Sequence, residues 1–423
     1  MILNISEHEI QKCKGWSFEN IYFFIMMLYL GMATGYTQVL CYPPSKGLWT
    51  FFIPILLTYF LIKRNKKCFR NTSVCFKALL VVIVWIVAQY FKYGKMEPMN
   101  IFLLYNICMA FVFCRVYGMR SFAMYEKCLV ILAALSLPVW ALYTLTPETM
   151  LSLFSVIGIK CEGTLEYSGI LCNLASSQDF LGFRNVGFAQ EPGHWASFLI
   201  IGMFINLLIN DFNYRNKSFF ILLAALITSQ STTGYSSFGI ILLMIIFSAK
   251  RSRIFLIVAS IFVIPSVVAL PFMREKIEKY AYTNESVENA RYNGEYLERN
   301  DDNAIFVPQR MDGFAFELMN FVNDPLMGYG IKETNSFISK TVSSRISCSN
   351  GNIKVFSKYG LFLAILFYSF LFKTGYILVS RKRKLVLLSW IILYLALGMS
   401  YEFTTIPLLL SFWIFSLLGY TKT

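Results

Sequence analysis

Long apolar runs recur along the whole chain, and they constrain its fold more than any other feature. A helix needs roughly 20 apolar residues to cross the hydrocarbon core of a bilayer. Twelve runs approach this length, at residues 20–38, 47–62, 74–91, 100–116, 128–146, 192–210, 218–232, 234–249, 254–271, 354–379, 385–400 and 402–419. Because backbone polar groups find no water inside a bilayer, each run is expected to be helical. The sequence therefore predicts an all-α, polytopic membrane protein with about 12 transmembrane helices.

The composition agrees with a membrane protein. Hydrophobic residues make up 57% of the chain and charged residues only 15%, whereas soluble domains carry about 25% charge. Residues 1–16 are polar and lack the basic, apolar and small-residue segments of a signal peptide. We therefore expect the first apolar run to be retained.

Basic clusters between the runs predict the orientation. Five of them fall on one side when the runs are threaded in order, at residues 63–70, 115–127, 215–217, 250–253 and 381–384. Short loops rich in Lys and Arg remain in the cytoplasm, so both termini are expected to be cytoplasmic. The net charge of +14 then largely reflects the basic residues that orient the helices in the membrane. The expected partner is the lipid bilayer and not nucleic acid.

Two long segments are expected on the opposite, outer side. The first covers residues 147–191, and the second covers residues 272–353. The chain thus divides into nine helices in residues 1–271, the large outer loop, and three helices in residues 354–423. The aromatic and glycine content of the large loop predicts a folded, partly helical domain.

Charged residues gather ahead of one apolar run, in "FRNVGFAQEPGHWASFLI" at 183–200. Proline suits the first turn of a helix, so Pro192 predicts a helix that begins near Glu191. Helix N-termini attract anions, and an arginine can hold a phosphate with two parallel hydrogen bonds. Arg184 and His194 therefore predict a site for a phosphate or pyrophosphate group. The alternative is helix capping with an interfacial salt bridge.

A second polar stretch, "ITSQSTTGYSSFGIILL" at 227–243, separates two short apolar runs. It predicts a tight outer turn or a broken helix, because irregular backbone at membrane depth must be covered by protein or water. Its hydroxyl groups, including Ser231, Thr232 and Thr233, either pack helices together or line a groove for sugar.

A third stretch combines "NDPLMGYG" at 323–330 with "SCSNGNIKVFSKYGLF" at 347–362. The first part has the Pro and Gly chemistry of a turn, and the second places Asn350 at the start of an apolar run. Upstream, "VPQRMDGFAFE" contains Arg310. This arginine is either part of a second anion site or a solvated loop charge.

The ten cysteines show no metal-binding spacing. Cys161 and Cys172 share the first outer segment, where they form either a disulfide or two free thiols. Histidine occurs only at His8 and His194, which excludes a His-rich metal site.

The order of these motifs resembles the O-antigen polymerase and ligase superfamily. An arginine and a glycine precede "EP" at the entrance of a span, a Ser/Thr-Gly turn follows, and a large outer loop carries "PLxGxG" and "SNG". The resemblance covers residues 180–365 and the number of spans. It implies a C-type glycosyltransferase of the bacterial inner membrane, with its active site in the periplasm.

The resemblance also implies roles for the site residues. Such enzymes use glycans carried on undecaprenyl pyrophosphate and need no metal or cofactor. Carried onto this sequence, Arg184 and Arg310 hold the pyrophosphate, while Glu191 or His194 takes the proton of the acceptor hydroxyl. The candidates for contact with the glycan are Ser231, Thr232, Thr233 and Asn350.

One departure favours a polymerase over a ligase. Ligases of the superfamily usually carry a histidine late in the large loop, where this chain reads "SCSNGN". A polymerase moves the growing glycan onto a new lipid-linked repeat unit, normally with a partner that regulates chain length. The alternatives are a ligase that transfers glycan to lipid A–core, and a lipid-linked oligosaccharide flippase. Flippases usually show two similar halves, which are not evident here.

Overall fold

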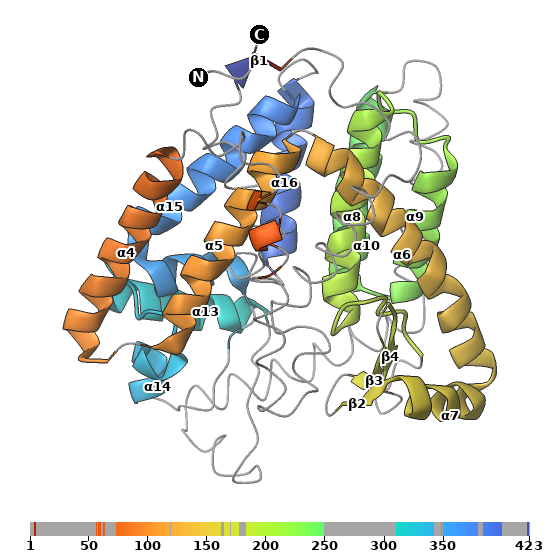
Figure 1. Ribbon diagram of the computed structural model, residues 1–423, viewed down its shortest axis with the longest axis horizontal. Coiled ribbons are helices and arrows are strands. Elements are labelled where there is room, and N and C mark those ends of the chain that lie inside the picture. The colour runs from red at the N-terminus through yellow and green to blue at the C-terminus, as the bar shows by residue number, and fades with distance from the viewer. Residues whose placement is uncertain are drawn as a thin grey trace.

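The structure is a computed structural model. It describes residues 4–5, 56, 58–60, 62–63, 73–95, 97–118, 120–161, 165–169, 171–176, 183–248, 310–341, 348, 350–379, 384–399 and 421–422. The described part is mostly helical (Figure 1). The apolar runs predicted at 20–38, 254–271 and 402–419 lie outside the described residues.

Most of the described chain belongs to helices that follow the apolar runs. The helices are α4 (Ser73–Tyr93), α5 (Pro98–Tyr117), α6 (Arg120–Leu145), α7 (Pro147–Ile157), α8 (Pro192–Ile209), α9 (Lys217–Ser229), α10 (Thr232–Ser248), α13 (Arg310–Asn323), α14 (Phe337–Thr341), α15 (Gly351–Val379) and α16 (Lys384–Gly398), with a 3-10 turn η4 at Glu333–Asn335. The strands are β1 (Asn4–Ile5), β2 (Ile159–Lys160), β3 (Leu165–Ser168), β4 (Asn173–Ala175) and β5 (Thr421–Lys422).

Three described helices are long and apolar enough to cross a membrane, namely Arg120–Leu145, Pro192–Ile209 and Gly351–Leu378. The other predicted spans that fall within the described residues form shorter apolar helices. The structure therefore shows a largely helical protein with three candidate membrane-spanning helices among the described residues, and the number of twelve spans stays a prediction.

Helix α8 lies at the centre of one half of the molecule. It is apolar all round, as expected for a helix with no exposed face. Helices α6, α9 and α10 pack around it, and α10 also packs against α16. Helix α16 contacts α15, which in turn contacts α13, while α4 packs against α5 (Figure 1). One continuous apolar core joins these helices except α13.

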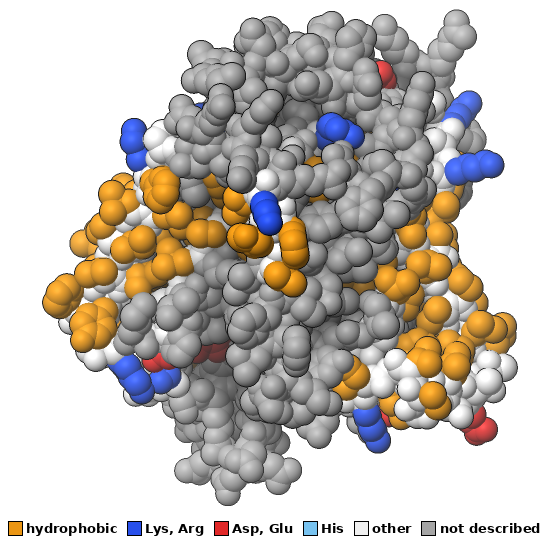
Figure 2. All heavy atoms as spheres, in the orientation of Figure 1, with side chains coloured by type: hydrophobic (Ala, Val, Ile, Leu, Met, Phe, Trp, Pro, Cys, Tyr) orange, Lys and Arg blue, Asp and Glu red, His pale blue; other side chains and the backbone are white. Residues whose placement is uncertain are grey.

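An apolar band faces outward around the helices. Large hydrophobic side chains are exposed on α4, including Leu80, Val84 and Phe91, and on α6. Figure 2 shows hydrophobic side chains gathered at mid-height on the left and right flanks of the visible face, with charged side chains mostly above and below them. An exposed apolar surface of this extent is typical of a protein that contacts lipid or another protein.

The connections differ from the expectation in two places. The basic stretch 115–127 is mostly helical, because α6 begins at Arg120 directly after a sharp break at Gly118. The outer segment 147–191 contains α7 and a small antiparallel sheet of order β2-β3-β4, so the fold is not purely α-helical. This sheet pairs backbone groups in a stretch that is too short and polar to continue as a helix.

The two sides of the bundle are distinct in Figure 1. One side carries α7, α13, α14 and the β2-β3-β4 sheet, and we refer to it as the sheet side. The opposite side carries both chain ends, where β1 pairs in parallel with β5 through Asn4–Thr421 and Ile5–Lys422. The described ends of the chain therefore lie together, on what we refer to as the terminal side.

Candidate functional site

The start of α8 lies on the sheet side and follows the predicted geometry. Pro192 occupies the first helical turn, and Glu191 is the N-cap residue with extended backbone. The Oε1 atom of Glu191 lies 2.9 Å from Nε2 of His194. The His194 side chain is 8% exposed and the Glu191 side chain 41%. A half-exposed carboxylate held by an imidazole is an arrangement that can accept a proton from a hydroxyl group.

Arg184 has a role that the sequence did not predict. Its Nε donates to the Ser229 carbonyl at 3.3 Å, and a terminal nitrogen donates to the Gln230 carbonyl at 2.9 Å. These carbonyls end α9, where the helix dipole is negative. The guanidinium is thereby fixed in place. The side chain therefore has a structural role at the end of α9.

The turn between α9 and α10 brings the first two polar stretches together. Gln230 has left-handed backbone (φ 49°, ψ 41°) and ends α9. The Ser231 hydroxyl accepts from the Gly234 amide at 3.2 Å and so caps α10. A β-carbon on Gly234 would lie 2.6 Å from the Cβ of Ala196 in α8. The predicted tight turn is therefore confirmed, and it packs directly on the first turns of α8.

The hydroxyl groups of this turn are mostly buried. Ser231 and Thr233 are 3% and 2% exposed, which favours their interpretation as packing and capping groups. Thr232 is half-buried. Of these three residues, Thr232 is the most exposed.

Two buried asparagines hold the loop that carries Arg184. Asn185 donates to the hydroxyls of Thr228 at 2.9 Å and Ser136 at 3.1 Å. Asn173, at the start of β4, donates to the carbonyls of Phe188 and Ala189. The sequence analysis missed both asparagines. The only signal in the sequence was their position in an otherwise apolar neighbourhood.

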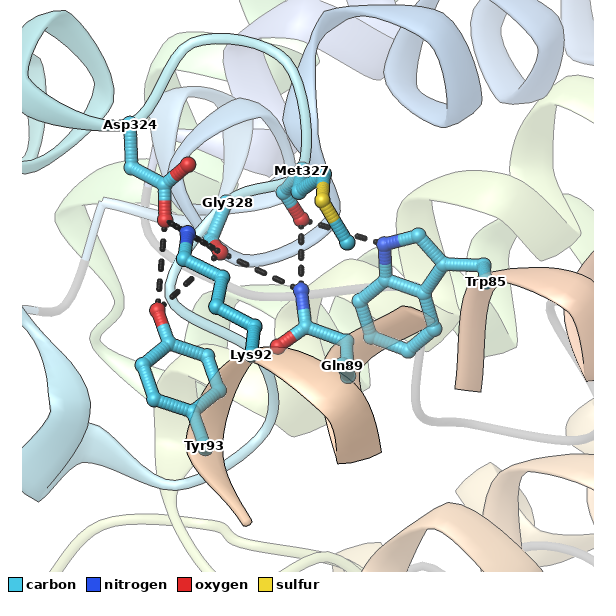
Figure 3. A network of polar contacts seen from close by, with 7 residues as sticks. All are labelled: Trp85, Gln89, Lys92, Tyr93, Asp324, Met327 and Gly328. Carbon is cyan, nitrogen blue, oxygen red and sulfur yellow. Dashed lines mark hydrogen bonds and ion pairs between the residues drawn. The ribbon is translucent and has the colours of Figure 1, made fainter. Parts of the chain in front are cut away.

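The "NDPLMGYG" turn forms a second polar cluster, against α4 (Figure 3). Gln89 donates to the carbonyls of Met327 at 2.7 Å and Gly328 at 3.1 Å. Trp85 donates to the Met327 carbonyl as well, at 3.1 Å. Lys92 forms an ion pair with Asp324. Four side chains of α4, counting the Tyr93 hydroxyl bonded to Asp324, thus hold this turn in place.

The same turn provides hydrogen-bond partners for backbone groups at a break in α15. Gly360 is non-helical (φ 77°, ψ 170°), so the hydrogen bonds of α15 are interrupted there. Tyr329 and Gly330 donate their amides to the carbonyls of Ser357 and Lys358 at 2.9 and 3.0 Å, and the Leu361 amide donates to Pro325 at 2.8 Å. The "PLxGxG" element and "SKYGLF" are therefore one structural unit, which positions the start of α15.

Asn350 and Arg310 belong to this second region. Asn350 is 2% exposed, and its side-chain oxygen accepts from the Ile353 amide at 3.4 Å, so it caps α15. Arg310 is the first residue of α13, and its side chain lies outside the described part. The structure therefore places Arg184 on the α9–α10 turn, which packs on the first turns of α8 where Glu191 and His194 lie, and it assigns Asn350 to a different cluster.

A buried glutamate under the turn was also missed. Glu317 on α13 is 2% exposed. It accepts hydrogen bonds from the Ser357 hydroxyl, from Asn320 at 3.2 Å and from the Tyr329 hydroxyl at 3.4 Å. Nearby, Lys354 contacts Oε1 of Glu333 at 2.5 Å. Burial raises the pKa of the Glu317 carboxyl above its ordinary 4.5, against the opposing effects of Lys354, Ser357, Asn320 and Lys358.

This burial predicts a pH-dependent stability. The folded protein binds the Glu317 proton more tightly than the unfolded chain does. The resulting contribution to the free energy of unfolding is complete below pH 4.5. It is lost as the pH rises through the raised pKa of the folded state. Glu317→Gln keeps the shape and removes the ionisation. Unfolding temperatures of both proteins across this range should diverge in favour of the glutamine variant as pH rises. A difference that stays constant with pH would contradict the prediction.

The cysteines of the first outer segment differ from both expectations. Cys161 is disulfide-bonded, whereas Cys172 is a free, buried thiol, so the two are not bonded to each other. Burial raises the pKa of the Cys172 thiol to about 12. That thiol is therefore protonated and unreactive at neutral pH.

No family model matches the sequence, and no curated protein matches it either. Within the described residues, no three His, Cys, Asp or Glu side chains are grouped so that they could hold a metal ion.

Proposed function

We propose that the protein is a membrane glycosyltransferase that polymerises lipid-linked repeat units of O-antigen or a related surface polysaccharide. The observation that carries the proposal is the cluster at the start of α8. An anchored arginine, a Glu191–His194 pair and a helix N-terminus occur together on one side of a membrane bundle. This combination suits a reaction in which a pyrophosphate leaves while a hydroxyl loses its proton.

The proposal includes a topology of twelve spans in the bacterial inner membrane. Its support is the position of basic residues at the helix ends on the terminal side. Arg115 and Arg120 lie where α5 meets α6, Arg215 lies between α8 and α9, and Lys217 begins α9. By the positive-inside rule, this side is cytoplasmic and both termini lie there. The sheet side, with its large loop at 272–353, is then periplasmic.

In the proposed reaction the substrate is an oligosaccharide on undecaprenyl pyrophosphate. The oxygen of an acceptor hydroxyl bonds to the anomeric carbon of the donor sugar, and the bond from that carbon to the pyrophosphate oxygen breaks. Glu191 takes the hydroxyl proton, and His194 orients the carboxylate. Arg184 stabilises the charge on the departing pyrophosphate. Arg310 is the proposed second phosphate contact and Thr232 the proposed neighbour of the glycan, whereas Asn350 is buried as the cap of α15.

The proposed base can be tested in a deletion strain. The surface polysaccharide is analysed on a gel after complementation with the wild type, Glu191→Gln, or Glu148→Gln, an exposed glutamate on α7 that serves as the matched control. We expect the wild type and Glu148→Gln to restore the polymer ladder. Glu191→Gln should leave a single repeat unit on lipid A–core, because its amide cannot accept the hydroxyl proton.

Other outcomes of the same gel would contradict the proposal. Bare core with polymer stranded on undecaprenyl carrier in the deletion strain identifies a ligase. Bare core without periplasmic glycan identifies a flippase. A full ladder with Glu191→Gln would agree with a polymerase but contradict Glu191 as the base. His194 would then be the next candidate for the base. A co-polymerase that sets chain length is the proposed partner and would alter ladder length only.

A further inference from the structure

Helix α7 turns sharply away from the membrane-spanning helix before it. Thr146 separates it from α6 with non-helical backbone (φ −137°, ψ 67°), and Pro147 begins the new helix. In Figure 1, α7 lies across the lower end of α6 on the sheet side. With 11 residues, Pro147–Ile157 is too short to cross a bilayer.

One face of α7 is buried against the rest of the protein. Met150 and Phe154 are each 5% exposed and pack with Tyr143 of α6 and Leu174 of β4. Phe183 packs against the same cluster, and it directly precedes Arg184 in the chain. This inner face therefore ties α7 to the loop that carries the candidate anion-binding arginine.

A second face of α7 is apolar but exposed. Leu153, Val156 and Ile157 are 49%, 83% and 59% exposed, and their spacing of three and four residues places them on one side of the helix. The polar residues Glu148 and Ser155 are also exposed. With Ser152 they repeat at the same helical spacing on another side. Helix α7 is thus amphipathic even in the part that the protein does not cover.

The exposed apolar face of α7 continues the exposed apolar surface of α6. Leu142 and Leu145, at the end of α6, are 50% and 78% exposed, and α6 is one of the helices long and apolar enough to cross a membrane. Figure 2 shows hydrophobic side chains running down the right-hand flank to the region of α7. The exposed apolar surface of α6 therefore continues onto α7.

We propose that α7 lies flat in the membrane–water interface on the sheet side, with Leu153, Val156 and Ile157 inserted among the lipid acyl chains. Helices with an apolar face, a polar face and too little length to span a bilayer bind in this way. Because Phe183 packs on the inner face of α7, the helix also holds Arg184 at the depth of the lipid headgroups. This inference concerns a lipid-binding surface and does not depend on the proposed enzymatic activity.

The test compares two neighbouring positions on different faces. A genetically encoded, environment-sensitive fluorescent residue replaces Val156 in one variant and Ser155 in the other, in the full chain reconstituted into phospholipid vesicles. Lipids brominated on their acyl chains should quench the emission at 156 and leave the emission at 155 nearly unchanged. Aqueous iodide should show the reverse. Leu153 provides an independent second position on the same face as Val156.

Two results would overturn the proposal. If iodide quenches at 156 as strongly as at 155, the apolar face of α7 lies in water. If neither reagent quenches at 156 or 153, protein covers that face, as in a contact between two copies of the chain. Both readouts are independent of polysaccharide synthesis, so they separate this inference from the proposed function.

Discussion

Replacing Gly360 with alanine is expected to destabilise the sheet side of the protein severely. Its backbone (φ 77°, ψ 170°) lies in a region that only glycine readily occupies, which alone costs about 1–3 kcal/mol for another residue. An added β-carbon would also overlap the Leu326 carbonyl oxygen. The turn at 324–330 would therefore be displaced from the break in α15, and the hydrogen bonds that Tyr329, Gly330 and Leu361 make there would be lost.

The measurement is thermal unfolding of the purified protein, together with proteolysis of residues 310–341. Gly239→Ala is the matched control, because a β-carbon at that position meets nothing within 4 Å. Gly94 also has a positive φ, of 66°, but an added β-carbon there meets nothing within 4 Å. The effect of Gly94→Ala therefore measures backbone strain alone. Wild-type stability and protease resistance in the Gly360 variant would show that the turn does not insert into α15.

Changing Arg184 to alanine should abolish polymer while the protein stays inserted and abundant. The change removes the positive charge proposed to hold the pyrophosphate and the two hydrogen bonds to Ser229 and Gln230. Loss of the bonds at the end of α9 should cost about 1–3 kcal/mol of stability. Arg184→Lys keeps the charge but cannot reach two acceptors with a planar fork, so it should restore activity only weakly.

Asn185→Ala separates the structural role of Arg184 from its charge. Asn185 also ties the loop to α9 through Thr228, but it carries no charge. We therefore expect Asn185→Ala to lower the unfolding temperature and to retain part of the polymer ladder, in contrast to Arg184→Ala. Equal losses of stability and polymer in both variants would reduce Arg184 to a structural residue. A normal ladder with Arg184→Ala would refute the anion site altogether.

The apolar runs predicted the described helices well, because length and hydropathy are local properties of the chain. The prediction at 192–210 matches α8, whose start at Pro192 follows from the fixed φ of proline. The prediction at 218–232 and 234–249 also matches α9 and α10 closely. The boundary at Arg120 was missed, since a basic stretch can lie in a helix as readily as in a loop.

The sequence by itself therefore determined most of the apolar helices among the described residues and the start of α8 at Pro192, but it missed α7 and the break at Gly360. The tertiary structure alone decided what the polar residues contact. Gln89 bonds to Met327 across 238 residues of sequence, and Arg184 reaches carbonyls 45 and 46 residues away. Glu317 is buried because α13 and α15 close over it. Apolar periodicity is repeated along a helix and is readable locally, whereas a hydrogen bond between distant segments exists only once the chain has packed.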